Sequence, residues 1–163
     1  MPITGLNHAV LFVRDVEASL GFYRDVLGFR VLMGQPGAAF LQAPGSVNDH
    51  DLGLFEIGAG AGPSSAGRST VGLYHLAWEV DTLDVLAAVR ADLVCAGALV
   101  GESDHGSTKS LYAKDPDGIE LEIAWIVPAD QLDAAPFTKD VRPRPLDLAA
   151  ERERFGATTV GGR

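Results

Sequence analysis

The chain has 163 residues, enough for one compact domain of two half-domains but not for a large additional domain. Its 22 acidic and 13 basic side chains give a formal net charge of −9, which argues against a nucleic acid or an anionic membrane as the main partner. No apolar run is long enough to span a membrane, and the first residues lack an export signal. The only cysteine, Cys95, has apolar neighbours, so we expect a cytoplasmic protein with a buried structural thiol.

The first half of the chain has the pattern of a strand, a helix and three strands. Residues 3–13 predict a strand, Asp15 a helix N-cap, and apolar residues at helical spacing predict a helix that stops at Gly28. Three β-type runs follow, at residues 29–33, 38–42 and 51–57. Residues 1–58 are therefore predicted to form one βαβββ module.

A segment rich in glycine and serine, residues 59–70, is the predicted linker, and after it the same order of elements returns. The predicted elements are a strand at 71–80, a helix at 81–95 with a break at Gly97, and strands at 98–101, 108–114 and 118–127. Residues 115–118, Asp-Pro-Asp-Gly, predict the turn between the last two strands. Residues 71–127 are therefore the second predicted module.

Residues 128–163 form a predicted C-terminal extension outside both modules. Several prolines interrupt this segment, and only residues 146–155 have the pattern of a short helix. We expect residues 156–163 to be frayed, and the extension to wrap either the body of the protein or a second subunit.

A short motif also occurs in both modules. Residues 5–8 (Gly-Leu-Asn-His) correspond to residues 72–75 (Gly-Leu-Tyr-His), 67 positions later (75 − 8). Each motif precedes an apolar run and then an aspartate. A repeat at a fixed offset indicates two copies of one supersecondary unit, so His8 and His75 should occupy equivalent places.

Two equivalent histidines favour a metal site, although a single histidine in an apolar strand is more often a satisfied pocket side chain. A divalent metal with two neutral imidazoles also needs a carboxylate. Glu120 and Glu122 share one face of the last strand, and a solvated face explains Glu120 well. Glu122 lies deeper in the apolar run, where an unpaired carboxylate would be costly, so it is the expected third ligand.

The doubled βαβββ plan, the two histidines and residues 112–122 (Tyr-Ala-Lys-Asp-Pro-Asp-Gly-Ile-Glu-Leu-Glu) resemble the vicinal oxygen chelate superfamily. This superfamily includes glyoxalase I, extradiol dioxygenases, epimerases and the bleomycin and fosfomycin resistance proteins. The resemblance covers residues 3–127 and implies an α+β fold of two tandem modules whose curved mixed sheets form a cup. It also implies His8, His75 and Glu122 as metal ligands.

Within the superfamily, residues 104–112 are similar to the segment of extradiol ring-cleaving dioxygenases that carries a histidine and a tyrosine before the ligand glutamate. The resemblance implies that His105 and Tyr112 act on the substrate, with Fe(II), or alternatively Mn(II), as the metal. The implied substrates are a small aromatic diol and dioxygen, and proteins of this plan often form homodimers. Tyr112 as a wall residue and His105 as an exposed turn residue remain open alternatives.

One departure concerns the pair of histidines that these dioxygenases carry before the fourth strand. Here the pair is His50-Asp51, so the usual acid/base position holds an aspartate. The ordinary pKa of an aspartate is far from neutral, and His50 is the alternative acid/base residue.

Two other functions stay open. In a glyoxalase I-like lyase, isomerase or epimerase, Glu56 would join His8, His75 and Glu122 around Ni(II) or Zn(II). In a relative of the bleomycin resistance proteins, the cup would bind a small molecule such as an antibiotic without catalysis.

Overall fold

The computed structural model describes residues 2–64, 66, 69–132 and 142–162 and divides the chain into two compact units. Unit 1 comprises Met1–Ser64 and Asp115–Gly118, and unit 2 comprises Ser65–Lys114 and Ile119–Arg163. The first division, between residues 64 and 65, falls inside the segment 59–70 that the sequence marks as a linker.

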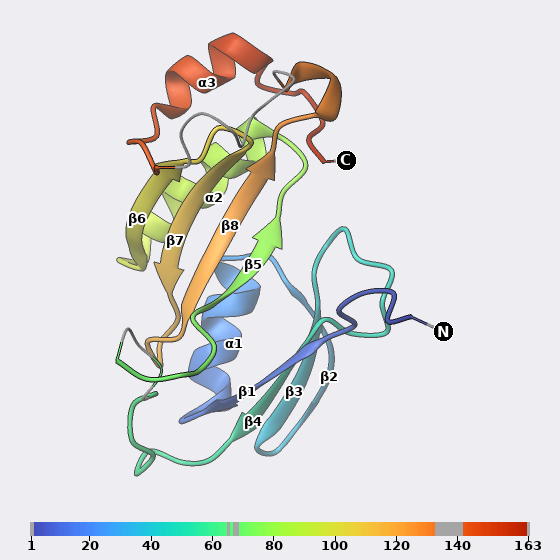
Figure 1. The fold of residues 1–163 in the computed structure, drawn as a ribbon. Helices are drawn as coiled ribbons and strands as arrows, with labels where there is room; N and C mark the ends of the chain where they lie inside the picture. The colour runs from blue at the N-terminus through green and yellow to red at the C-terminus, as the bar shows by residue number, and fades with distance from the viewer. Residues whose placement is uncertain (1, 65, 67–68, 133–141, 163) are drawn as a thin grey trace. The chain divides into compact units, whose positions relative to one another are not determined.

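Unit 1 contains a four-stranded mixed sheet and one helix (Figure 1). Its elements are β1 (Ala9–Val13), α1 (Val16–Asp25), β2 (Arg30–Gln35), β3 (Ala38–Gln42) and β4 (Leu52–Glu56). The strand order is β1-β4-β3-β2, in which β1 and β4 are parallel and the other neighbours antiparallel.

Unit 2 repeats this topology and adds the C-terminal segment. Its elements are β5 (His75–Glu79), α2 (Leu83–Cys95), β6 (Leu99–Asp104), β7 (Thr108–Lys114), β8 (Glu120–Ile126), the short 3-10 helix η1 (Ala129–Gln131) and α3 (Leu148–Phe155). The order β5-β8-β7-β6, with β5 and β8 parallel, matches unit 1 strand for strand. The predicted α+β fold of two βαβββ repeats is confirmed.

Local signals explain where the helices begin and end. The Asp15 carboxylate caps α1 by accepting a hydrogen bond from the Ala18 backbone N–H at 2.9 Å, as predicted. Thr82 caps α2 in the same way, one residue later than the expected start at Asp81. Gly28 and Gly97 follow the two helices with φ of 76° and 66°, a left-handed conformation that favours glycine.

In each unit, one face of the sheet packs against the helix and forms the core. In unit 1 the alternation of β1 buries Leu11 and Val13 and leaves Val10 and Phe12 exposed on the opposite face. In unit 2, Leu121, Ile123 and Trp125 of β8 are buried on the helix side. The opposite faces are therefore where polar side chains of the strands remain accessible.

The end of the chain is not frayed, contrary to the sequence-based expectation. The Gly161 N–H donates to the Asp81 carbonyl at 2.7 Å, and the Gly162 N–H donates to the Ile126 carbonyl at 3.0 Å. Before them, α3 lies beside α2 in unit 2 (Figure 1). Glycine makes this close approach possible, because a Cβ on Gly161 would lie 2.5 Å from the Ile126 carbonyl oxygen.

The prediction that Cys95 is a buried thiol is wrong, because Cys95 is exposed at the end of α2. The apolar neighbours that suggested burial divide between two helix faces: Leu93 is buried, whereas Val94 is 53% exposed. Within the described residues, no helix is both long enough and apolar enough to cross a membrane.

Candidate metal and substrate site

The expected ligands His75 and Glu122 meet on the open face of the unit 2 sheet. His75 begins β5, and Glu122 lies on the neighbouring strand β8, where it pairs with Ala77, two residues beyond His75. The two side chains therefore project from the same face, and His75 Nε2 lies 3.0 Å from Glu122 Oε2. Both side chains are mostly buried, at 24% and 14% exposure.

Tyr112 and His105 extend this contact along the same face. Tyr112 on β7 is the strand partner of Glu122, and its ring centroid lies 6.0 Å from that of His75. His105, in the turn between β6 and β7, places Nε2 2.9 Å from the Tyr112 hydroxyl. Burial, followed by the charge of Glu122, raises the pKa of Tyr112 to about 12, so its hydroxyl keeps its proton at neutral pH.

These donors suit a divalent transition metal. One neutral imidazole nitrogen and one carboxylate oxygen already converge, which is the chemistry that Fe(II), Mn(II), Ni(II) and Zn(II) accept from proteins. His75 Nδ1 is buried without a hydrogen-bond partner in the described part of the chain. Within those same residues, no three potential ligands are close enough together to hold an ion, and the described part of unit 2 brings together two of the three expected ligands.

The third expected ligand, His8, lies in unit 1 immediately before β1 and is exposed. Its Nδ1 lies 2.7 Å from the Asn7 side-chain oxygen, so the neighbouring amide engages this ring nitrogen. Sequence analysis did not single out Asn7, since only the structure shows which way an amide beside a histidine points.

His50 packs against His8, with ring centroids 4.4 Å apart. An aromatic row continues from His50 to Phe40 at 5.2 Å and from Phe40 to Phe55 at 5.8 Å. These rings, on the sheet face of unit 1 opposite α1, surround Gly53, where a Cβ would lie 3.6 Å from Phe40 and from Phe55. Because Gly53 has no side chain, the Phe40 and Phe55 rings lie close to the backbone of the strand.

The Asp51 carboxylate stabilises a loop, which differs from the acid/base role considered for it. Its buried carboxylate accepts hydrogen bonds from the Ala43 backbone N–H, the Ser46 hydroxyl and the Asn48 side chain, each at 2.8 Å. These bonds hold the loop between β3 and β4. They leave little capacity for Asp51 to exchange a proton with a substrate.

Glu56 lies on the face of the unit 1 sheet opposite to His8. It pairs with Val13, which is buried on the α1 side, and its Oε2 accepts from the Val16 N–H at 3.0 Å. The carboxylate thus stabilises the beginning of α1, where the helix dipole favours a negative charge. This position does not suit Glu56 as a ligand beside His8.

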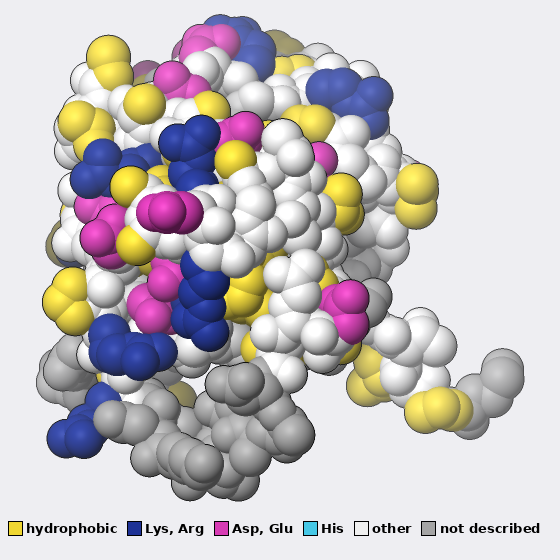
Figure 2. Space-filling model, turned by 90° about the horizontal axis from the view of Figure 1, so that it is seen from above, with side chains coloured by type: hydrophobic (Ala, Val, Ile, Leu, Met, Phe, Trp, Pro, Cys, Tyr) yellow, Lys and Arg dark blue, Asp and Glu magenta, His cyan; other side chains and the backbone are white. Residues whose placement is uncertain are grey.

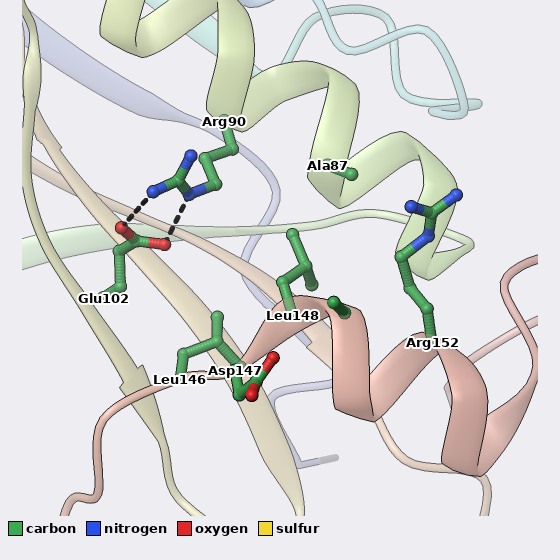
Figure 3. Close-up of a pocket in the computed structure, with 8 residues that line it drawn as sticks. Ala87, Arg90, Glu102, Leu146, Asp147, Leu148 and Arg152 are labelled. Atoms are coloured by element: carbon green, nitrogen blue, oxygen red, sulfur yellow. Dashed lines mark hydrogen bonds and ion pairs between the residues drawn. The ribbon is translucent and has the colours of Figure 1, made fainter.

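A pocket of about 450 Å³ in unit 2 lies elsewhere, among α2, β6 and the start of α3 (Figure 3). The predicted metal ligands do not line it. Its most prominent feature is the ion pair in which Arg90 meets both oxygens of Glu102, at 2.6 and 2.8 Å. This pocket is therefore separate from the candidate site.

The chain is similar in sequence to known dioxygenases. Over 123 residues the chain is 35% identical to catechol-2,3-dioxygenase of Bacillus subtilis (strain 168), covering 74% of this chain and 41% of that protein. It is 36% identical over 121 residues to biphenyl-2,3-diol 1,2-dioxygenase 3 of Rhodococcus globerulus, covering 72% and 62%. The chain thus spans about half the length of the curated dioxygenases it matches. It is also 29% identical to lactoylglutathione lyase of Haemophilus influenzae (strain ATCC 51907 / DSM 11121 / KW20 / Rd), covering 71% of this chain and 87% of that protein.

Solved structures share the fold. A glyoxylase/bleomycin resistance protein/dioxygenase domain from Frankia sp. EAN1pec aligns with a TM-score of 0.63 at 26% identity, covering 76% of this chain and 92% of that one. A family model described as Glyoxalase/Bleomycin resistance protein/Dioxygenase superfamily matches residues 5–123. This chain therefore belongs to the glyoxalase/bleomycin resistance protein/dioxygenase superfamily.

Proposed function

We propose that this protein is a metal-dependent extradiol dioxygenase that cleaves the ring of a small catechol-type diol with dioxygen. The observation that carries the proposal is the continuous line of side chains on the open face of unit 2. His75 contacts Glu122, Tyr112 lies opposite Glu122 on the next strand with its ring 6.0 Å from that of His75, and the Tyr112 hydroxyl contacts His105. Ligand-type groups thus stand directly beside groups that can exchange protons with a substrate.

We propose His8, His75 and Glu122 as the ligands of Fe(II), with Mn(II) as the alternative ion. When bound, an ion with two imidazole ligands and one carboxylate keeps open positions for a diol and for dioxygen. The engagement of His8 Nδ1 by Asn7 and the contact between His75 and Glu122 support this ligand set. An obvious companion proposal is that two chains associate as a homodimer in the cytoplasm.

The remaining residues are assigned by what they touch. Tyr112 would orient a substrate oxygen by hydrogen bonding, and its high pKa keeps the hydroxyl a donor. His105, 2.9 Å from that hydroxyl, would accept or return a proton. In unit 1 His50 is the better candidate for a second proton carrier, since the Asp51 carboxylate already accepts three hydrogen bonds.

A planar aromatic substrate suits the aromatic row of unit 1. His50, Phe40 and Phe55 form ring contacts in sequence, and Gly53 lets the Phe40 and Phe55 rings lie close to the strand. Edge-to-face and offset ring contacts favour an aromatic ring over an aliphatic chain of the same size.

Two alternatives differ in the groups they require. A glyoxalase I-like lyase, isomerase or epimerase with Ni(II) or Zn(II) would use Glu56 as a ligand, but Glu56 lies on the α1 side of its sheet. The likeness to lactoylglutathione lyase keeps this activity as the second candidate. A purely binding protein for an antibiotic would give no reason for the contact between His75 and Glu122.

The test is oxygen consumption by protein purified and loaded with Fe(II) under anaerobic conditions, measured with a panel of catechols. The proposal predicts one dioxygen consumed for each diol and a yellow ring-fission product. Turnover of a hemithioacetal of glutathione without oxygen uptake would instead support the lyase. Tight binding of an apolar drug with neither reaction would support the binding protein.

A further inference from the structure

The C-terminal extension reaches the candidate site through a buried lysine that the proposed mechanism does not use. Lys109, on β7, is fully buried and pairs with Trp125 on the helix side of the sheet. Its ammonium group lies 2.5 Å from Asp104 Oδ1 and 2.9 Å from Glu151 Oε2. Burying an ammonium group is costly unless it is paired with opposite charge, so the two carboxylates compensate the buried charge of Lys109.

The first partner, Asp104, organises the turn that carries His105. The carboxylate that accepts from Lys109 also accepts from the Gly106 N–H at 2.7 Å. The His105 N–H donates to the Thr108 carbonyl at 2.9 Å, and Gly106 has φ of 81°. The ion pair thus closes a turn whose backbone fixes the direction of the His105 side chain.

The second partner, Glu151, belongs to α3 and so to the extension. A second link joins the same turn to the extension: the backbones of Asp104 and Arg144 exchange two hydrogen bonds at 2.8 and 3.0 Å. Phe155 of α3 packs on Trp125 at 5.5 Å, and its ring lies 5.5 Å from the Lys109 ammonium group. The extension therefore holds the base of the turn at several points.

The surface around α3 carries charged side chains of both signs. Lys and Arg side chains lie interleaved with Asp and Glu there, without a broad area of one sign (Figure 2). Leu148 at the start of α3 points toward α2 across the pocket (Figure 3). Arg152 of α3 also forms an ion pair with Asp84 of α2. These contacts seat α3 against unit 2 itself.

We propose that Lys109 and Glu151 are positioning residues that set the contact between His105 and Tyr112. The chain of contacts runs from Glu151 to Lys109, to Asp104, to the turn, and to His105 Nε2 beside the Tyr112 hydroxyl. The consequence for catalysis rests on the proposed function, whereas the effect on the His105 side chain does not. The extension would then be part of the working site although it contributes no group to it.

The experiment is ¹H–¹⁵N NMR of the histidine rings in the full chain, with the His105 signals assigned by a His105→Gln variant. The main variant is the double substitution Lys109→Met with Glu151→Met, which removes the buried ammonium group and one of its two carboxylates and keeps apolar volume. Asp104 retains the Gly106 N–H and the Arg144 guanidinium as partners. Glu153→Gln, on the exposed side of the same helix, is the control. We expect the His105 ring signals to shift in the double variant and to stay in the control.

Unchanged His105 ring signals in a folded double variant would overturn the inference. A single Glu151→Gln variant, which leaves Lys109 with Asp104, should give a smaller shift in the same direction. If the wild type cleaves catechols, kcat should also fall about tenfold in the double variant with little change in KM, as for a misplaced catalytic group. A shift without any dioxygenase activity in the wild type would leave the positioning role intact and refute the proposed function alone.

Discussion

Tyr112 is the residue whose role is most sharply defined by its neighbours. It is the strand partner of Glu122, and its hydroxyl lies 2.9 Å from His105 Nε2. Tyr112→Phe removes only the hydroxyl, so we expect about a hundredfold loss of kcat while metal content stays at the wild-type level. Steady-state kinetics beside metal analysis measures this. A Tyr112→Phe variant with wild-type kcat would show that the hydroxyl serves the sheet and not the reaction.

Asp51 should behave as a structural residue. Removing its carboxylate leaves three donors without an acceptor, so Asp51→Ala should lower the free energy of unfolding by about 2 kcal/mol or more. Asp49→Ala, at a carboxylate that is 79% exposed, is the matched control and should change stability by less than about 0.5 kcal/mol. Chemical denaturation provides both values. Full stability of Asp51→Asn together with lost turnover would return Asp51 to the acid/base role.

Among the elements, the end of the chain makes the clearest steric prediction. A Cβ on Gly161 would lie 2.5 Å from both the Ile126 carbonyl oxygen and Trp125 Nε1. Gly161→Ala should therefore displace the terminal segment and destabilise the protein by about 1–3 kcal/mol, whereas Gly62→Ala, with open space around it, should be nearly neutral. Thermal denaturation compares the two. Equal melting temperatures would mean that the terminal segment contributes nothing to stability.

The ion cluster that joins β6, β7 and α3 should respond to acid. Burial alone would raise the pKa of Asp104, but the hydrogen bonds from Lys109 and Gly106 and the charges of Lys109 and Arg144 lower it below the ordinary value. Protons therefore bind the unfolded state at higher pH than the folded state, so this contribution to stability is complete above about pH 4 and is lost as the pH falls through the folded-state pKa.

The pH dependence can be isolated by comparing the wild type with Asp104→Asn. We expect the difference in unfolding free energy between them to be constant from pH 5 to 7, where both proteins are measurable, and to shrink below about pH 4. A difference that does not change in acid would show that Asp104 titrates alike in both states.

Sequence reasoning located the elements well because their signals are local. The caps at Asp15 and before α2, the glycines after both helices and the Asp-Pro-Asp-Gly turn all act within a few residues. In that turn the Gly118 N–H donates to the Asp115 carbonyl at 2.9 Å. The terminal segment was mispredicted because its bonds reach Asp81 and Ile126, far away in the chain.

At the scale of the whole molecule, the duplication explains which parts of the candidate site could be predicted. Strand alternation and the repeat are enough to place His75 and Glu122 on one face, and the structure brings their side chains into contact. The sequence could not show on which face of the unit 1 sheet Glu56 lies. A shift of one residue in a short strand moves a side chain to the other face, and here Glu56 lies on the α1 side, where it accepts a hydrogen bond from the Val16 N–H. The sequence could not reveal the Lys109 cluster either, since that cluster depends on how a distant helix docks.

The duplication also accounts for the different surroundings of the two equivalent histidines. Unit 2 holds a histidine and a glutamate in contact, and unit 1 carries the equivalent histidine with its Nδ1 engaged by Asn7. In unit 1, Glu56 lies near the position that corresponds to Glu122, and its carboxylate accepts a hydrogen bond from the Val16 N–H at the start of α1. The two copies have thus taken different tasks, and the proposed ligand set of two histidines and one glutamate follows from that difference.

The most direct test of this account is the metal content of protein purified anaerobically and supplied with Fe(II), for the wild type, Glu122→Gln and Glu120→Gln. Both variants change a glutamate of β8 to its amide. Glu120 is the backbone partner of His75 across the two strands, whereas the Glu122 carboxylate lies 3.0 Å from His75 Nε2. The account predicts about one bound ion per chain in the wild type and in Glu120→Gln, and loss of the ion in Glu122→Gln. Equal metal content in all three proteins, or none in any, would contradict it.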